Sequence, residues 1–389
     1  MKGRTLGLAL LTLVVIAIAW KVSQDKAPQT EVSRSQLYPG LLDRLNEVSR
    51  VRLSSGEDTT LLERDGERWV LANKDGYPAD GAAVRRAVLQ LASLRVVEPK
   101  TAKAERYARL GVEDVGDDNG SGTLVELLAG DDQALARLIV GNSSDTTSDP
   151  RYYVRRAGEA QSWLVEGALT VPADPIPWVD ASIVDVDTAR VAAVRIEPAE
   201  GAPVVIRKAE RDDSFFALEN VPEGHVAKSK ATISSGGAVL LDLRFNDVMS
   251  ADSVAGQAPL RTVTVQTFDG LTVTMTDYAH NDAVVTAFTF AASETTATAA
   301  TEAETAAAPA NAVAETGSVD EATETDADDA SATDDGADAE TVAEEAMRLS
   351  ATTAGWVYTL PDYKRRMIER DLDSLIEPAS SAQADEASE

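Results

Sequence analysis

The chain of 389 residues has no cysteine and only two histidines. The absence of cysteine excludes disulfide bonds, thiolate metal sites, a cysteine nucleophile and a lipid-modified N-terminal cysteine. It does not define the compartment, because cysteine-free chains occur on both sides of a membrane. Histidine is the commonest general base. His225 and His280 lie in predicted loops, and neither has a metal-ligand neighbour at a usable spacing.

Short catalytic motifs are also missing: the sequence has no G-x-S-x-G, no H-E-x-x-H and no Walker A motif. Gly141-Asn142-Ser143 follows a predicted strand, but neither GK[ST] nor a helix follows it. Asp145 and Asp149 are too few for a calcium loop, which needs more carboxylates at fixed offsets. A carboxylate pair for sugar hydrolysis stays open in so acidic a chain. We therefore predict a non-enzyme, with no catalytic, cofactor-binding or metal-binding residues.

Charge of one sign dominates, and the formal net charge is -29 at pH 7. Sixteen acidic residues, and no Lys or Arg, lie between 291 and 346. This segment is rich in Ala, Thr, Glu and Asp and cannot bury enough apolar surface to offset its ordering entropy. We predict a disordered acidic insert at 291–346, with residues 339–349 turning helical as they rejoin the fold. A cation- or partner-binding acidic arm is the alternative. So acidic a chain should repel nucleic acid.

The one long apolar run extends from Leu6 to Trp20, after Lys2 and Arg4. Two interpretations compete. A cleaved signal peptide would use Ala17-Ile18-Ala19 as its small-residue site. We favour an uncleaved signal anchor at 1–22, because the Ala-x-Ala lies inside the apolar run. The basic residues would keep the N-terminus cytoplasmic. This predicts a single-pass inner-membrane protein whose body is periplasmic.

The remaining sequence predicts an α+β fold of two similar modules, each an antiparallel sheet with helices. The order of strands and helices in the first half recurs in the second, with few identities. Phe215-Phe216-Ala217-Leu218 takes the place of Arg68-Trp69-Val70-Leu71, and Pro222 that of Pro78. The predicted segments are the anchor at 1–22, a tether and short helix at 23–47, the modules at 48–178 and 179–378, and a disordered tail at 379–389.

The first module shows the pattern most clearly. Alternating strands are predicted at 51–53, 60–64 and 68–71, with Asp65-Gly66 as a hairpin turn. A helix is predicted at 80–94, with Asp80 as its N-cap. The remaining predictions for this module concern single residues and later strands. Trp69 should be core, Trp178 should plug the junction between the halves, Arg85 and Arg86 should face solvent, a helix should span 102–110, and strands should follow at 123–128, 136–140, 152–156 and 162–165.

The second module has strands predicted at 191–197, 203–208 and 215–218 and a helix at 229–245, which Gly236 and Gly237 weaken. Four later elements complete it. Strands are predicted at 261–268, 271–276, 283–290 and 356–359, with Asp269-Gly270 as a hairpin turn, and a final helix at 364–376.

Several short motifs, taken in order, resemble the domain of unknown function family 4340. The resemblance covers most of residues 48–378, apart from the long acidic insert. The residues that carry it are Glu67-Arg68-Trp69-Val70-Leu71, Pro78-Ala79-Asp80, Leu91-Ala92-Ser93-Leu94, Tyr107-Ala108-Arg109-Leu110-Gly111-Val112, Leu138-Ile139-Val140-Gly141, Tyr152-Tyr153-Val154-Arg155 and Pro177-Trp178-Val179-Asp180.

Members of that family are typically membrane-anchored and often encoded beside ABC-type transport components of the gliding-motility type. The resemblance therefore implies a non-catalytic extracytoplasmic accessory or scaffold protein, with ABC-transporter membrane subunits as partners and no cofactor. It supplies no catalytic residues. Two alternatives stay open: a periplasmic ligand-binding protein or envelope hydrolase that uses a cleft between the modules, and a structural cell-surface spacer.

Overall fold

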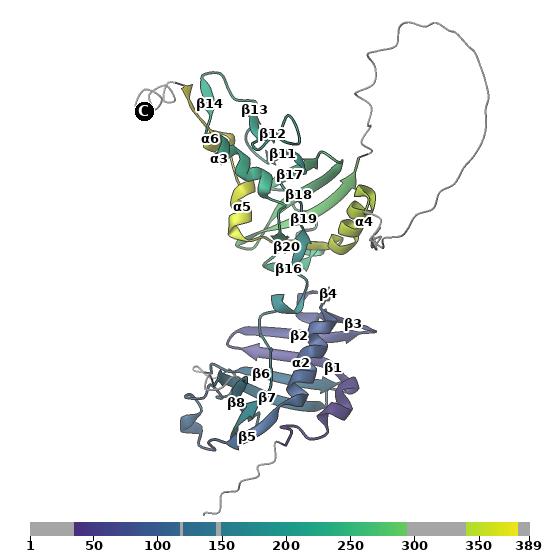
Figure 1. The fold of residues 1–389 in the computed structure, drawn as a ribbon, viewed down its shortest axis with the longest axis vertical. Helices are drawn as coiled ribbons and strands as arrows, with labels where there is room; N and C mark the ends of the chain where they lie inside the picture. The colour runs from purple at the N-terminus through teal and green to yellow at the C-terminus, as the bar shows by residue number, and fades with distance from the viewer. Residues whose placement is uncertain (1–34, 117–119, 145–148, 294–339, 380–389) are drawn as a thin grey trace, which may run out of the picture. The chain divides into compact units, whose positions relative to one another are not determined.

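The computed structural model describes residues 35–116, 120–144, 149–293 and 340–379 (Figure 1). The predicted anchor, residues 23–34 of the tether, most of the acidic insert and most of the tail lie outside these ranges. The chain divides into two compact units, Met1–Ala181 (unit 1) and Ser182–Glu389 (unit 2). Within the described ranges, no helix combines the length and apolar character needed to cross a bilayer.

Unit 1 is a nine-stranded antiparallel sheet in the order β4-β3-β2-β1-β6-β7-β8-β9-β5. Its strands are β1 (Val48–Ser55), β2 (Asp58–Asp65), β3 (Arg68–Leu71), β4 (Tyr77–Pro78), β5 (Arg95–Pro99), β6 (Thr123–Ala129), β7 (Ala134–Ser143), β8 (Arg151–Arg156) and β9 (Ser162–Glu166). Its helices are α2 (Gly81–Ser93) and the 3₁₀ turns η1 (Leu41–Glu47), η2 (Ala72–Lys74), η3 (Ala104–Arg106) and η4 (Ile176–Trp178).

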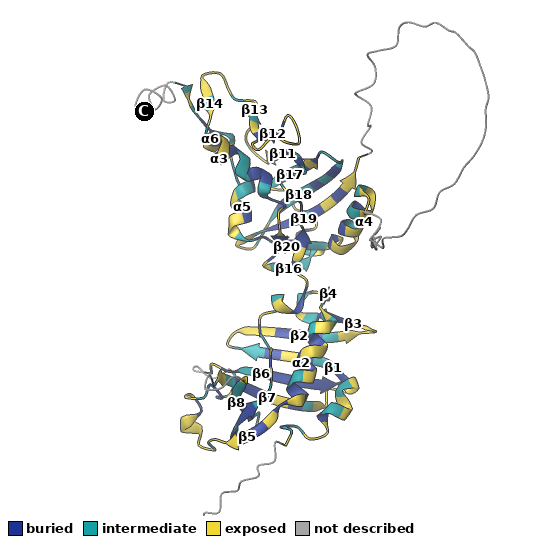
Figure 2. Ribbon diagram, in the orientation of Figure 1, coloured by how far each residue is buried: buried dark blue, intermediate teal, exposed yellow. Residues whose placement is uncertain are grey.

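The core of unit 1 lies between α2 and one face of this sheet (Figures 1 and 2). Alternation along the strands places Leu53, Leu62 and Leu71 on that face, all fully buried. Val84 and Leu91 cover them from α2, at the helical spacing seen in the sequence. The same alternation sends charged side chains to the opposite face, so one strand pattern builds both a core and a solvated surface.

Four local predictions for unit 1 are confirmed: the helix cap at Asp80, the hairpin turn at Gly66, the burial of Trp69 and the exposure of Arg85 and Arg86. The Asp80 carboxylate accepts hydrogen bonds from the backbone N–H groups of Ala82 and Ala83, which caps α2. Gly66 turns the β2–β3 hairpin with a φ of 60°. Trp69 is buried in the core, and Arg85 and Arg86 are exposed.

Unit 2 contains an eight-stranded antiparallel sheet in the order β13-β12-β11-β17-β18-β19-β20-β16, and two two-stranded sheets, β10-β15 and β14-β21. Its strands are β10 (Ser182–Val184), β11 (Val191–Pro198), β12 (Val204–Arg207), β13 (Ala217–Glu219), β14 (His225–Ala227), β15 (Leu243–Arg244), β16 (Asp247–Ser250), β17 (Arg261–Thr267), β18 (Leu271–His280), β19 (Ala283–Ala292), β20 (Trp356–Thr359) and β21 (Ile376–Pro378). Its helices are α3 (Lys230–Ser234), α4 (Val342–Thr353), α5 (Asp362–Ile368), α6 (Leu372–Leu375) and the 3₁₀ turns η5 (Ser235–Ala238) and η6 (Ala251–Val254).

The two large sheets share one order of connections. In unit 1, β1 pairs with β2 and β6, and Val51 lies opposite Leu62 and Leu127. In unit 2, β11 pairs with β12 and β17, and Val194 lies opposite Ile206 and Val265. The register shifts near the start of both central strands, after Val48 and after Val191. The strands from β3 to β5 in the order of the first sheet therefore have positional counterparts in the second, from β13 to β16, while β4 has none among the described strands.

The register also fixes which residues correspond at the third strand of each sheet. Leu71 lies opposite Leu62 in unit 1, and Leu218 lies opposite Ile206 in unit 2. Two residues earlier stand Trp69 and Phe216, both buried. The predicted match of 68–71 with 215–218 is thus confirmed. Pro222, in contrast, precedes β14 and does not occupy the place that Pro78 has within β4.

Helix content is lower than predicted, so the fold is mostly antiparallel β with a few helices. The helix predicted at 102–110 is one turn, η3, because Tyr107 turns inward to a buried cluster with Val112 and Ile139. The helix predicted at 364–376 is two short helices, α5 and α6. Asp371, with extended backbone, stands before the second one, and Asp favours such cap positions.

The helix predicted at 229–245 is also wrong in its extent. It ends with α3 and the single turn η5, and the chain then forms β15. The two glycines predicted to weaken this helix lie against core side chains. A Cβ on Gly236 would lie 3.0 Å from Ile206 Cδ1, and a Cβ on Gly237 would lie 2.3 Å from the Phe216 ring. Close packing against Ile206 and Phe216 therefore explains why glycine occupies positions 236 and 237.

The predicted acidic insert is shorter than 291–346 at both ends. Ala291 and Ala292 belong to β19, and α4 begins at Val342. Thr341 and Glu344 form a capping box, in which each side chain bonds the other residue's backbone N–H. The helical turn predicted within 339–349 is confirmed. Residues 294–339 lie outside the described part of the chain.

Candidate functional site

The two histidines occupy separate strands. His225 begins β14 and His280 ends β18. His225 Nδ1 lies 3.4 Å from the backbone oxygen of Glu223. In the part of the chain that the structure describes, no three His, Cys, Asp or Glu side chains gather as metal ligands would.

Gly141 serves packing and lies within β7 instead of a phosphate-binding loop. A Cβ on Gly141 would lie 2.1 Å from the backbone oxygen of Leu110, so only glycine lets the two segments approach. Asn142 holds the contact, because its N–H donates to the oxygen of Leu110 at 2.9 Å. Two of the motifs that carry the family resemblance therefore meet at this point. Asp145 lies outside the described residues.

A buried arginine fastens the same segment to the sheet. Arg155 Nε donates to the backbone oxygen of Val112 at 2.8 Å, and Nη1 donates to that of Glu159 at 3.1 Å. Nη2 pairs with Asp114 at 2.7 Å, and the guanidinium lies 4.6 Å from the centre of the Tyr107 ring. Sequence reasoning gave Arg155 no role, although it ends the Tyr152-Tyr153-Val154-Arg155 motif. Its bonds hold the fold together.

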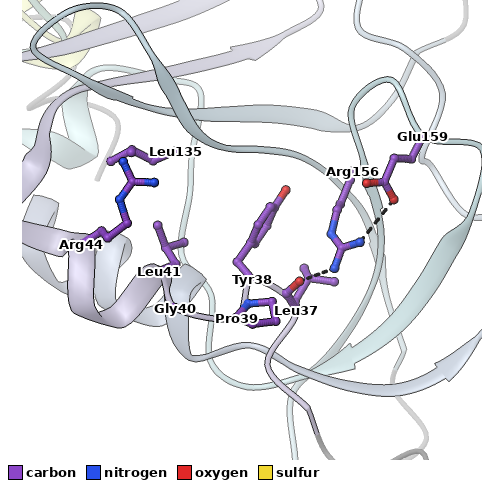
Figure 3. Close-up of a pocket in the computed structure, with 9 residues that line it drawn as sticks. All are labelled: Leu37, Tyr38, Pro39, Gly40, Leu41, Arg44, Leu135, Arg156 and Glu159. Carbon is purple, nitrogen blue, oxygen red and sulfur yellow. Dashed lines mark hydrogen bonds and ion pairs between the residues drawn. The ribbon is translucent and has the colours of Figure 1, made fainter.

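A pocket of about 360 Å³ lies in unit 1 between the first described residues and the β8–β9 turn (Figure 3). Tyr38 and Arg156 form its centre, with the guanidinium 5.3 Å from the ring centre. Arg156 donates to the backbone oxygen of Leu37 and pairs with Glu159, as the dashed lines of Figure 3 show. Tyr38 donates its hydroxyl to the oxygen of Arg137 at 2.7 Å. Burial raises the pKa of Tyr38 to about 12.

Unit 2 has a larger cavity, of about 670 Å³, beside β13. The segment leading into β13 forms one wall, with Phe215 and Phe216. The end of β14 and the start of α3 form the other, with Ala227, Lys230 and Ile233. Phe215 is 50% exposed, so an apolar ring stands at the rim. We call this space the β13 cavity.

The rim of the β13 cavity carries charges of both signs. Asp212 and Asp213 lie on the wall before β13, and Lys228 and Lys230 lie on the opposite wall. The Asp213 carboxylate accepts the N–H groups of Ala209 and Glu210 and so shapes the loop. Such a site can hold an apolar group flanked by polar or charged groups.

Two buried ionisable groups of unit 2, Asp277 and Lys364, form hydrogen bonds to residues of their own unit. Asp277 accepts the Thr286 hydroxyl at 2.8 Å and pairs with Arg261 at 3.2 Å. Burial raises the pKa of the Asp277 carboxyl, against the opposing effect of those partners. Lys364 donates to the backbone oxygens of Ala238 and Leu241, and burial lowers its pKa.

Comparison with known proteins gives one result. The family model of a domain of unknown function, DUF4340, matches residues 69–261, which include Arg155, Trp178 and the lining of the β13 cavity. No curated protein and no solved structure matches the chain. The chain therefore carries a DUF4340 domain, a domain of unknown function, over residues 69–261.

Proposed function

We propose that this protein is a non-catalytic accessory or scaffold subunit, held at the inner membrane by residues 1–22, with its body in the periplasm. The apolar run from Leu6 to Trp20, after Lys2 and Arg4, supports the anchor and its orientation. The DUF4340 match covers residues 69–261, and the usual setting of that family, beside ABC-type transport components, motivates the choice of partner. The matching strand order of the two sheets supports descent of both units from one duplicated module.

The observation that carries the scaffold role is the sheet edge at β13. Among the described strands, β13 pairs with β12 alone, and it borders a cavity of about 670 Å³. Proteins usually cover or charge a sheet edge, because its backbone groups invite pairing with another chain. The edge at β13, beside a cavity whose lining includes Phe215, Phe216 and Ile233, suits a protein that holds a partner. The polar groups at the centre of the Tyr38–Arg156 pocket instead bond their own unit.

The proposal is tested by crosslinking the tagged full-length protein in its own membrane and identifying what co-purifies. We expect the membrane and ATPase subunits of an ABC transporter. Protease added to intact spheroplasts should degrade the body, because it faces the periplasm. Recovery of the protein alone would overturn the accessory role, and protection of the body in spheroplasts would overturn the orientation.

The alternative function is periplasmic ligand binding, and one observation favours it. The Tyr38–Arg156 pocket, at about 360 Å³, falls within the size range of small-molecule sites. A thermal-shift screen of small anionic and aromatic compounds tests this. A rise in melting temperature that Tyr38→Ala abolishes would support the alternative, and no shift would count against it.

A further inference from the structure

The two units differ at one corresponding sheet edge. In unit 1, β4 covers the outer edge of β3, with Tyr77 opposite Leu71 and Pro78 opposite Val70. The Ala79 N–H donates to the backbone oxygen of Trp69 at 2.8 Å. In unit 2, β14 follows β13 in the same order but pairs with β21 instead, with Val226 opposite Glu377. Among the described strands, the edge of β13 therefore has no counterpart of β4.

The backbone groups at this edge point away from β12. Lys208 donates its N–H to the oxygen of Ala192, so alternation turns Arg207 toward β13. Arg207 lies opposite Ala217, and the N–H and C=O of Leu218 must then face outward. Leu218 corresponds to Leu71, whose backbone faces β4 in unit 1. The backbone of Phe216 faces outward as well, and its N–H donates to Ser234 Oγ at 2.9 Å. The outward groups offered to a new strand are therefore the C=O of Phe216 and the N–H and C=O of Leu218.

The β13 cavity lies between β13 and the β14–α3 segment, where unit 1 has its β3–β4 contact. In unit 1 that place is filled by Tyr77, which is buried. In unit 2 Leu218, the counterpart of Leu71, is only partly buried and Phe215 is exposed. Figure 1 shows β14 at the end of unit 2, beside the strand that precedes the C-terminus. The cavity thus has the position for one added side chain, with Phe215, Phe216 and Ile233 as apolar parts of its lining.

We propose that β13 accepts an extended segment of a partner polypeptide as an added antiparallel strand, with one apolar or aromatic side chain in the β13 cavity. This inference rests on the proposed accessory role and names the surface that holds the partner. The rim, with Asp212 and Asp213 facing Lys228 and Lys230, fits a peptide with charges of both signs. It does not fit nucleic acid, whose charge is uniformly negative. Strand addition is an established mode of peptide recognition.

The first experiment uses the strand that fills the corresponding place in unit 1. A fluorescein-labelled peptide with the sequence of residues 72–80 is titrated with detergent-solubilised full-length protein, and fluorescence anisotropy is measured. We expect saturable binding. Leu218→Pro removes the outward N–H without removing a bond to β12, and it should weaken binding at least tenfold. Leu218→Ala also loses the side chain but keeps the N–H, so it should bind more tightly than Leu218→Pro.

A change in the peptide gives a control that leaves the protein intact. N-methylation of the peptide's Ala79 removes the N–H that would bond the Phe216 oxygen, and it should weaken binding at least tenfold. Hydrogen exchange of the Leu218 amide should slow when the unmodified peptide is bound. No saturable binding, equal binding by Leu218→Pro and Leu218→Ala, or unchanged Leu218 exchange would overturn the inference.

A photo-crosslinking amino acid at position 215 of the full-length protein in its membrane separates this inference from the accessory role. Crosslinks to one extended segment of another protein, lost in Leu218→Pro, would support both. Co-purification of transporter subunits that Leu218→Pro does not change would retain the accessory role and overturn the β13 site. Peptide binding at β13 with no co-purifying subunit would retain the site and overturn the accessory role. Crosslinks to a second copy of this chain would overturn the choice of a different protein as partner and would indicate self-association at β13.

Discussion

Gly237 lies so close to the ring of Phe216 that a Cβ at this position would stand 2.3 Å from the ring carbon Cε2. Phe216 is the counterpart of Trp69, so this contact closes the core of unit 2 where α2 meets Trp69 in unit 1. The corresponding contact in unit 1, between Gly81 of α2 and Trp69, is less close: a Cβ on Gly81 would lie 3.4 Å from Trp69 Cδ1. The helical segment formed by α3 and η5 therefore packs directly against the Phe216 ring.

Substituting Gly237 by alanine should destabilise unit 2 through overpacking, by about 1–3 kcal/mol. The measurement is urea denaturation followed by circular dichroism. Gly236→Ala is the matched control, because its Cβ would meet the mobile end of Ile206 at 3.0 Å and should cost less. Equal stability of Gly237→Ala and the wild type would contradict the close contact.

Trp69→Ala should cost roughly 3–5 kcal/mol, because it empties the buried site between β3 and α2. The same denaturation measurement applies. Phe215→Ala removes a ring that is 50% exposed and should be close to neutral. A near-neutral effect of Trp69→Ala would refute its place in the core.

Arg155→Lys should destabilise unit 1 by about 2–3 kcal/mol. A lysine cannot reach the oxygens of Val112 and Glu159 and the Asp114 carboxylate together, so at least one of these acceptors loses its donor. Arg195→Lys, on an exposed strand position, is the control and should change little. Thermal melts of the two variants give the comparison. Similar melting temperatures would mean that Arg155 does not fasten the 107–114 segment.

Tyr38 should make stability depend on pH in the alkaline range. Its pKa rises from 10.0 to about 12 on folding, chiefly through burial. The native protein therefore keeps a proton that the unfolded chain loses above pH 10. This contribution to stability is complete below pH 10 and is lost as the pH rises through about 12.

The comparison is between the wild type and Tyr38→Phe. At pH 8 the variant should be less stable by about 1 kcal/mol, the usual net value of the lost hydrogen bond to Arg137. That difference should shrink and then change sign as the pH rises from 10 to 12, because the rise in the pKa of Tyr38 from 10.0 to about 12 is worth about 2.7 kcal/mol. The difference in tyrosinate absorbance between the two proteins should show one group titrating near pH 12. A constant stability difference, or titration of that group near pH 10, would contradict the burial of Tyr38.

Elements fixed by local pattern could be predicted from the sequence, and elements fixed by distant contacts could not. Alternation gave the strands around Leu53 and Leu62, and Asp80 gave the start of α2. The strand β5 was missed, since it follows α2 at once and pairs with β9 some sixty residues later. The helix at 229–245 was overestimated, because Phe216 and not local propensity decides the glycine positions.

The β13 cavity shows the same limit at the candidate site. Its walls come from two short apolar segments that the sequence suggests, around Phe216 and Ile233. The opening between them exists because β14 pairs with β21, and His225 lies opposite Pro378. No pattern near β14 encodes a pairing with the far end of the chain. The repeat was visible in the sequence, but the difference between its two copies was not.

The first described residues of unit 1 are fastened to the sheet by bonds from several elements. Ser35 accepts a hydrogen bond from the Val96 N–H of β5, and Leu37 donates its N–H to the oxygen of Leu94 just before β5. Arg156 donates to the Leu37 oxygen, and the Tyr38 hydroxyl donates to Arg137 of β7. A pulling force that arrives through a membrane anchor would enter unit 1 here and spread across β5, β7 and β8 together. If residues 1–22 form the proposed anchor, this attachment would distribute the load over several strands of the nine-stranded sheet, and no single edge strand would carry it alone.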